Sequence, residues 1–265
     1  MQALYSRCHA PADANGARPG RDIGAGSCVE CGSYPAQRGA AVREMYMNND
    51  LTLYGYWRSS ASYRVRIALE LKGLAYENRP VHLVRDGGEQ HEVEYSEINP
   101  QQLVPTLLHG KRVITQSLAI IEYLDEIWPD GPPLLPATPR DRAYARALVF
   151  HLACDVHPLG NLRVLQYLER ECAMPQVERE NWARHWIETG FSAIEQMLDS
   201  SPNTGAYCMG DSPGLVDVCL VPQVYNAHRW GVAMDTYPTI SRIHDHCLEI
   251  EAFRAAAPEA QPDAP

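Results

Sequence analysis

The sequence predicts a small α/β domain followed by an all-helical domain, and three observations lead to this fold class. From residue 51 to about residue 128, short apolar runs alternate with segments of helical spacing. Residues 129–139 are so rich in proline that they mark a stiff linker and a domain boundary. Beyond this linker the periodic segments have the spacing of helices.

The composition is that of a globular protein long enough for two modest domains, with 265 residues and 45% hydrophobic content. No apolar run approaches the roughly 18 residues that a membrane-spanning helix needs. The net charge of −10 argues against a general binder of nucleic acid or anionic membranes. The eight cysteines do not form a disulfide framework. Five of them are scattered through helical or apolar segments and are expected to be small buried side chains in a reducing compartment, so we expect a cytoplasmic protein; they are Cys154, Cys172, Cys208, Cys219 and Cys247.

Residues 1–48 differ in kind, because they are rich in Gly, Pro, Ala and Arg and carry too few large apolar residues for a core. We expect a disordered extension, or residues that precede a true start at Met45 or Met47. This segment contains Cys28 and Cys31 in a C-x-x-C spacing. A lone C-x-x-C with irregular partners is a weak zinc signal, so we expect no metal site.

The first domain, residues 49–130, opens with a strand over residues 51–54 and a helix that begins at Ser59 or Ser60. The elements expected next are a strand over 76–84, a short helix near 91–96, a hairpin of strands 106–108 and 112–114, and a helix from 117 that ends before 128. The resulting order, βαβαββα, is that of a thioredoxin-like domain.

The helical domain is expected to follow the linker of residues 131–139 and to be followed by a short tail. We expect the helical domain to extend over residues 140–257 and the tail over residues 258–265. The helices expected in the domain cover residues 140–172, 176–200, 215–227 and 239–248.

The chemistry is expected at the start of the first helix, where a strand turns into a helix N-terminus. Ser59 or Ser60 is suited to cap this helix with its hydroxyl. The unpaired N–H groups and the positive end of the helix dipole suit a carboxylate, a phosphate or a thiolate. The residues alone leave open a hydroxyl nucleophile, an anion site or a simple cap.

The run from Ser59 to Leu69 resembles the signature S-S-C-S-W-R-V-R-I-A-L of the zeta-class glutathione transferases. The resemblance extends from about Leu51 to the C-terminus. This class includes maleylacetoacetate isomerases and bacterial maleylpyruvate isomerases. The sequence departs from the signature at Ala61, where the class usually has cysteine, so a redox role that needs a thiolate at this position is excluded.

The resemblance implies a glutathione site with the sulfur at the helix N-terminus, where Ser59 donates a hydrogen bond to the thiolate. It also implies a cis proline that turns a backbone strand edge toward the ligand, although trans is the rule for X-Pro bonds and is what the sequence alone favours. The residues implied are Ser59, Ser60, Gln90 at the glycyl end, Val104, Pro105, Gln116 and Ser117 at the γ-glutamyl end, and His157.

The resemblance also implies a substrate side lined by the helical domain. Arg229 lies in the segment whose arginine anchors a substrate carboxylate, and Arg58 is a second candidate next to the active serine. Asn161 and Arg163 are weaker candidates. On an acidic protein these arginines would create the local positive potential that a dicarboxylate needs.

The activity implied is glutathione-dependent isomerisation of maleylacetoacetate to fumarylacetoacetate, a step of phenylalanine and tyrosine catabolism, by a homodimer acting on a small enedione dicarboxylate. The alternative is the maleylpyruvate isomerase of gentisate degradation, which Ala61 favours because relatives of that type tolerate loss of the cysteine. A glutathione-conjugating transferase is another alternative, and a non-catalytic interaction module of the same fold is the last. The complete set of Ser59, Val104-Pro105 and Gln116-Ser117 argues against the interaction module.

Overall fold

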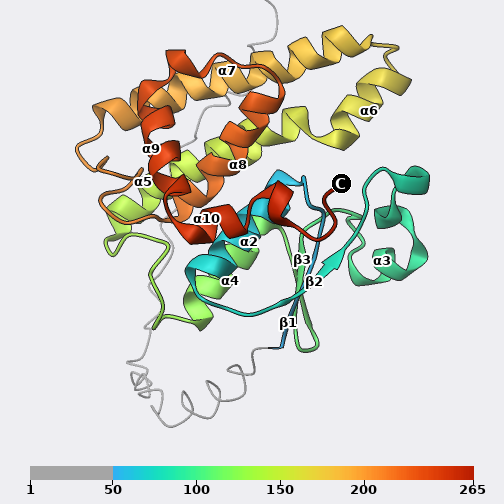
Figure 1. Ribbon diagram of the computed structural model, residues 1–265, viewed down its shortest axis with the longest axis horizontal. Helices are drawn as coiled ribbons and strands as arrows, with labels where there is room; N and C mark the ends of the chain where they lie inside the picture. Colours follow the sequence, from blue (N-terminus) through green and yellow to red (C-terminus); the bar gives the residue numbers. More distant parts are fainter. Residues whose placement is uncertain (1–49) are drawn as a thin grey trace, which may run out of the picture. The chain divides into compact units, whose positions relative to one another are not determined.

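The computed structural model describes residues 50–265 (Figure 1), and within them the expected fold class is confirmed. The order βαβαββα is present and is followed by helices alone. The predictions for residues 1–48, which include the early extension, the alternative start and the pair Cys28 and Cys31, lie outside the described residues. No helix within residues 50–265 is long and apolar enough to cross a membrane.

The first part is built on a four-stranded sheet of order β2-β1-β3-β4. Strand β1 pairs in parallel with β2 and antiparallel with β3, which forms the expected hairpin with β4. Helices α2 and α4 pack against each other beside the sheet, and α3 lies on its other side (Figure 1). The bounds are β1 Leu51–Gly55, α2 Ser60–Leu71, β2 Glu77–Pro80, η1 Arg85–Gly87, η2 Glu89–His91, α3 Val93–Ile98, β3 Thr106–His109, β4 Arg112–Thr115 and α4 Ser117–Ile127.

Strand β2 is shorter than the predicted segment of residues 76–84, and hydrogen bonds beyond Pro80 explain why. The N–H of His82 donates to the Glu89 carboxylate, and the N–H of Arg85 donates to Nδ1 of the His82 ring. Strand β1 ends at Gly55, which pairs with Pro80, so the residues that follow have no strand to pair with, and these two N–H groups bond to side chains instead. The chain therefore leaves the sheet after Pro80 and turns into η1.

The second part consists of helices, with one break that the sequence analysis missed. The bounds are α5 Pro139–Phe150, η3 His151–Val156, η4 His157–Gly160, α6 Leu162–Arg170, α7 Gln176–Ser200, α8 Leu215–Arg229, η5 Met234–Thr236, α9 Pro238–Leu248, α10 Glu251–Ala255 and η6 Pro258–Ala260. A continuous helix over residues 140–172 is wrong, because Pro158 lacks an N–H and disfavours helix at the residue before it. After α5 the helix widens into a π-helical turn at η3 and then narrows into a 3-10 turn at η4. A new helix, α6, begins where Asn161 caps it.

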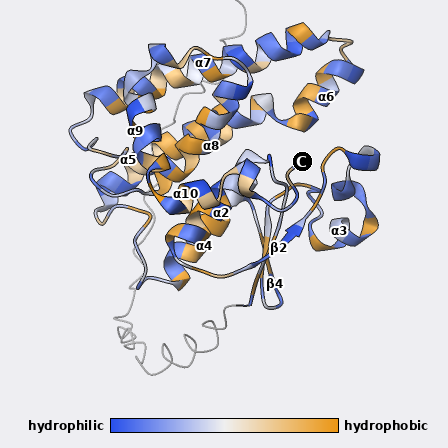
Figure 2. Ribbon diagram, in the orientation of Figure 1, coloured by the Kyte–Doolittle hydropathy of each residue, from blue (hydrophilic) through white to orange (hydrophobic). Residues whose placement is uncertain are grey.

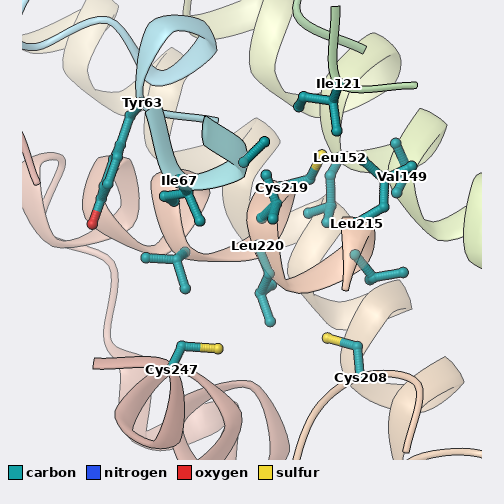
Figure 3. Close-up of a cluster of buried hydrophobic side chains, with 14 of the residues drawn as sticks. Tyr63, Ile67, Ile121, Val149, Leu152, Cys208, Leu215, Cys219, Leu220 and Cys247 are labelled. Carbon is teal, nitrogen blue, oxygen red and sulfur yellow. The ribbon is translucent and has the colours of Figure 1, made fainter. Parts of the chain in front are cut away.

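Helix α8 lies at the centre of the core and joins the two parts, since it packs against both α2 and α5. Hydrophobic residues gather on α2, α4 and α8 (Figure 2). Ile67 of α2, Ile121 of α4 and Leu220 of α8 belong to one buried cluster (Figure 3). The short last segment, expected to be a tail, also packs onto the first part, because Asp263 accepts a hydrogen bond of 2.9 Å from the N–H of Trp57.

The cysteines of the described residues divide into two groups. Cys208, Cys219 and Cys247 are free, buried and part of the core, as expected (Figure 3). Cys154 and Cys172 are free but exposed, so the expectation of buried side chains is wrong for these two. Both lie in the interrupted segment, Cys154 within η3 and Cys172 just after α6, which places them at the surface rather than in the core.

Gly190 allows α7 to approach η3, the turn that leads into His157. A Cβ at this position would clash with Cγ2 of the buried Val156, whose β-branched side chain has little freedom to move. Alanine raises helix propensity by about 1 kcal/mol over glycine, whereas overpacking costs about 1–3 kcal/mol. We therefore expect Gly190→Ala to lower the free energy of unfolding by up to about 2 kcal/mol, measured by urea denaturation. In a Val156→Ala background the same change should be neutral or stabilising, and equal effects in both backgrounds would refute the steric explanation.

Candidate active site

The N-terminus of α2 forms as the sequence predicts. Strand β1 ends at Gly55, and the turn that follows delivers Ser59 as the N-cap, whose Oγ accepts from the N–H of Ser62 at 3.2 Å. This bond uses the oxygen as an acceptor, so the hydroxyl proton stays available for a ligand. With the positive end of the helix dipole behind it, Ser59 is suited to stabilise a negative atom in front of the helix.

Ser60 is held from the helical part of the molecule. The amide Nδ2 of Asn226, on α8, donates a hydrogen bond of 2.8 Å to Oγ of the buried Ser60. The Ser60 hydroxyl proton is likewise left to donate elsewhere. Asn226 is not among the site residues predicted from the sequence, where its only signal is a polar side chain within the segment that carries Arg229.

A small cavity of about 90 Å³ lies in front of these serines, and a larger one of about 370 Å³ lies beside it. His157 and Asn161 line both cavities, so the two adjoin. The structure distributes most of the predicted site residues between them. The small cavity has Arg58, Ser59, Ser60 and Arg229 in its wall, and the large one has Val104, Pro105, Gln116, Ser117 and Arg163.

Two backbone features shape the larger cavity. The Val104–Pro105 bond is cis, as the resemblance implied, and the trans bond that the sequence alone favoured is wrong. Gln116, the residue directly before α4, has a φ of 70°, in the left-handed region that non-glycine residues rarely adopt. Its Nε2 donates to Oε1 of Gln101 at 2.9 Å. Ser117 is buried beside it, at the start of α4.

Two guanidinium groups stand at the small cavity. Arg58 lies over the ring of Trp57 and Arg229 over the ring of Trp230, with 5.3 Å and 4.6 Å from guanidinium carbon to ring centroid. Desolvation of the guanidinium and the charge of Arg58 both lower the pKa of Arg229. An anion between the two groups would relieve this repulsion, so the small cavity favours a carboxylate.

Gln90 is the predicted site residue that the structure does not bring to either cavity. Its side chain is buried, and its Nε2 donates to the carbonyl of Leu83 at 3.4 Å. The same atom lies 3.1 Å from Nε2 of His91. Gln90 thus packs behind the loop that carries Leu83 and Val84, and it is this loop that lines the small cavity.

His157 is uncharged at neutral pH. Desolvation of its ring and the charge of Arg64 lower its pKa to about 3, against about 6.5 in an unfolded chain. As the pH falls from about 6.5 toward 3, the unfolded chain therefore binds a proton that the folded protein does not, and stability decreases.

We expect His157→Gln, which keeps an N–H donor but does not titrate, to lose less stability on acidification than the unchanged protein. Urea unfolding at about pH 7 and about pH 4.5 measures this difference. An equal loss in both proteins would mean that the ring is protonated in the folded state at the lower pH.

The chain is similar to proteins of known sequence and structure. Residues 49–126 match the glutathione S-transferase N-terminal domain. A protein of Vibrio cholerae named probable maleylacetoacetate isomerase is 51% identical over 214 residues, which cover 81% of this chain and 98% of that protein. A solved structure described as a maleyl pyruvate isomerase, a bacterial glutathione-s-transferase in zeta class, aligns with a TM-score of 0.78 and 45% identity over 81% of this chain and 100% of its own.

The chain belongs to the zeta class of the glutathione transferases. Other members of the class carry both isomerase names. The maleylpyruvate isomerase of a Ralstonia species is 46% identical over 80% of this chain and 99% of its own length. A maleylacetoacetate isomerase structure from Anaeromyxobacter dehalogenans, solved with glutathione in the active site, has a TM-score of 0.72 and 41% identity over 82% of this chain and 98% of its own.

Proposed function

We propose that this zeta-class glutathione transferase is a glutathione-dependent cis–trans isomerase that converts maleylacetoacetate to fumarylacetoacetate, a step of phenylalanine and tyrosine catabolism. One observation carries the proposal. Two serine hydroxyls at the positive end of α2 face a small cavity flanked by Arg58 and Arg229, beside a larger cavity that has room for a peptide. This arrangement suits a thiolate in front of the helix and a substrate carboxylate near the guanidinium groups.

The residues present fit glutathione in the larger cavity. The wall of this cavity combines the N-terminus of α4, which suits a carboxylate, with the buried cation Arg64. Gln116 and Ser117 would hold the γ-glutamyl end, the Val104 backbone would pair with the cysteinyl backbone, and the sulfur would point toward Ser59. When bound, glutathione supplies a thiolate that adds reversibly to the cis double bond and permits rotation about it.

The side chains of the protein have three tasks in this reaction. Ser59 and the positive end of α2 keep the sulfur deprotonated near neutral pH. Arg58 and Arg229 bind the carboxylate of the substrate and orient its double bond toward the sulfur. Neutral His157 and Asn161 stand where the two cavities meet and offer hydrogen bonds to either ligand.

Maleylpyruvate isomerase of gentisate degradation is the second candidate. Ala61, which lines the larger cavity in place of the cysteine of the class, favours it. Sequence identity does not separate the two candidates, because the Ralstonia enzyme is 46% identical and relatives named maleylacetoacetate isomerase are equally similar. Both substrates share the reacting enone and a carboxylate, so the same residues would serve either. A conjugating transferase and a non-catalytic interaction module of the same fold are less favoured, because the relatives from Vibrio cholerae and the Ralstonia species, at 51% and 46% identity, carry isomerase names.

The free, buried cysteines of the core are compatible with a reducing compartment, and we include a cytoplasmic location and a homodimer in the proposal. The expected partners are small enedione dicarboxylates.

The decisive experiment is turnover of maleylacetoacetate and of maleylpyruvate, with and without glutathione, while free thiol is measured. Isomerisation that requires glutathione and leaves the thiol concentration unchanged would establish the isomerase, and the ratio of the two rates would choose the substrate. A falling thiol concentration would identify a conjugating transferase instead. Absence of both reactions together with failure to bind glutathione would indicate an interaction module.

A further inference from the structure

Arg64, in the second turn of α2, is a buried cation with unused hydrogen-bonding capacity. Arg64 is only 2% exposed, and its Nη1 donates to Oγ of Ser117 at 3.4 Å. Among residues 50–265, its Nε and Nη2 have no hydrogen-bond partner. Taking a charge out of water without a counter-charge costs several kcal/mol in proteins. Such a group calls for a partner that the folded chain does not itself supply.

Arg66, two residues further along the same helix, shows what a satisfied arginine looks like in this core. It is equally buried, yet its Nε donates to the carbonyl of Ala256 and its Nη2 to the carbonyl of Trp57, both at 2.9 Å. Its role is to tie α2 to the C-terminal segment and to the turn before the helix. The contrast indicates that the open donors of Arg64 are not a general consequence of burial on α2.

Arg64, whose unpartnered Nε and Nη2 are buried, stands in the wall of the larger cavity. Arg64 lines this cavity together with Ser117 and His157, and none of the residues described in its wall is an aspartate or glutamate. Because His157 is neutral near pH 7, it neither balances nor adds to the charge of the guanidinium. The cavity therefore has a net positive wall, and an anionic ligand is the remaining source of a counter-charge.

The identity of the two open atoms indicates the shape of the anion. Nε and Nη2 form one edge of the guanidinium plane and present two parallel N–H groups. Arg146 uses this same edge to hold the two carboxylate oxygens of Glu122, at 3.0 Å and 2.8 Å. A thiolate would use one of the two donors, whereas a carboxylate matches both.

We propose that Arg64 binds a carboxylate of the ligand in the larger cavity through its Nε and Nη2 edge, while its Nη1 positions Ser117 for the same ligand. This inference rests on the proposed function in taking glutathione as the ligand. The carboxylate is then that of the γ-glutamyl residue, because Ser117 stands at the N-terminus of α4 where that end would lie. Arg64 supplies the charge, and Ser117 and the α4 N-terminus supply neutral donors.

The proposal predicts opposite effects of one substitution on stability and on binding. Arg64→Met removes an unpaired buried charge, so the ligand-free protein should melt at the same or a higher temperature. Glutathione should bind roughly 10- to 100-fold more weakly, since the lost hydrogen bonds are to a charged group. Arg66→Met, the matched control, should lower the melting temperature and leave glutathione affinity nearly unchanged in the protein that still folds.

Titration calorimetry and thermal unfolding of the full chain test this with two peptides. The first is glutathione, and the second is an analogue without the γ-glutamyl α-carboxylate. The unchanged protein should bind the analogue roughly 10- to 100-fold more weakly than glutathione, and Arg64→Met should bind both about equally. A third peptide, an analogue without the glycyl carboxylate, is the control, and its affinity relative to glutathione should fall by the same factor in both proteins.

Several outcomes would overturn the proposal. The proposal is wrong if Arg64→Met binds glutathione as tightly as the unchanged protein does, if it still binds glutathione more tightly than the analogue without the γ-glutamyl α-carboxylate, or if it loses stability as Arg66→Met does. If the unchanged protein binds no glutathione, the proposed function fails, and malonate serves as the probe. Arg64-dependent thermal stabilisation by malonate would then support a carboxylate site on its own, and the absence of that stabilisation would refute it.

Discussion

Ser59→Ala should raise the pKa of bound glutathione toward the value of about 8.5 of a free thiol and slow isomerisation roughly 100-fold at neutral pH. The Ser59 oxygen is occupied as the acceptor of the Ser62 N–H, so its proton is the one directed donor that the N-cap offers to a ligand. Loss of a preorganised donor to a developing or stable anion has an effect of this size. The thiolate absorbance of the enzyme–glutathione complex, titrated against pH, measures the shift directly.

The cap and the donor can be separated by the choice of substitution. Ser59→Ala also removes the helix cap, which costs about 1 kcal/mol, whereas glycine at an N-cap costs only a few tenths. Ser59→Gly should therefore lose the thiolate as fully as Ser59→Ala while keeping most of the stability, and Ser59→Thr should keep both. An unchanged thiolate titration in Ser59→Gly would transfer the role to Ser60, which Asn226 holds in place, or to the helix N-terminus.

Arg229→Leu should lower kcat/KM for the dicarboxylate substrate about 10- to 100-fold, equivalent to about 1.5–3 kcal/mol for a hydrogen bond to a charged group. We expect this loss to come mainly from a higher KM with little change in kcat, because the carboxylate is bound alike in the ground state and the transition state. The nearby charge of Arg58 disfavours the charged form of Arg229 in the free enzyme, so both guanidinium groups would attract a carboxylate that lies between them. Initial rates over a range of substrate concentrations provide the measurement.

Arg163 is the matched control for this prediction. It was predicted to lie on the substrate side, but it lines the larger cavity together with the residues expected to bind glutathione. Arg163→Leu should therefore leave the KM of the dicarboxylate nearly unchanged. In a double-mutant cycle, Arg58→Leu and Arg229→Leu should be non-additive, as expected for two groups that share one ligand. A larger effect on KM from Arg163→Leu than from Arg229→Leu would reverse the assignment of the two cavities.

The sequence determined the elements whose signal is local. The hydrophobic spacing after Ser59 predicted α2, the serine hydroxyl predicted its cap, and the linker prolines predicted the change to helices. The resemblance of the run from Ser59 to Leu69 indicated the family, because the same few residues cap α2 and form the expected binding site for the thiolate. Such features depend on neighbouring residues and can be read from one segment.

Tertiary structure decided what depends on residues far apart in the chain. Pro158 interrupts a predicted helix and brings His157 to the boundary of both cavities, and Asn226 reaches Ser60 across 166 positions. The spacing that makes α2 a helix gave no sign that Arg64 and Arg66 would be equally buried, one with two unpartnered donors and one satisfied by backbone carbonyls. Periodicity reports which side of a helix is apolar, but the partners of a buried charge are set by the elements that fold against it.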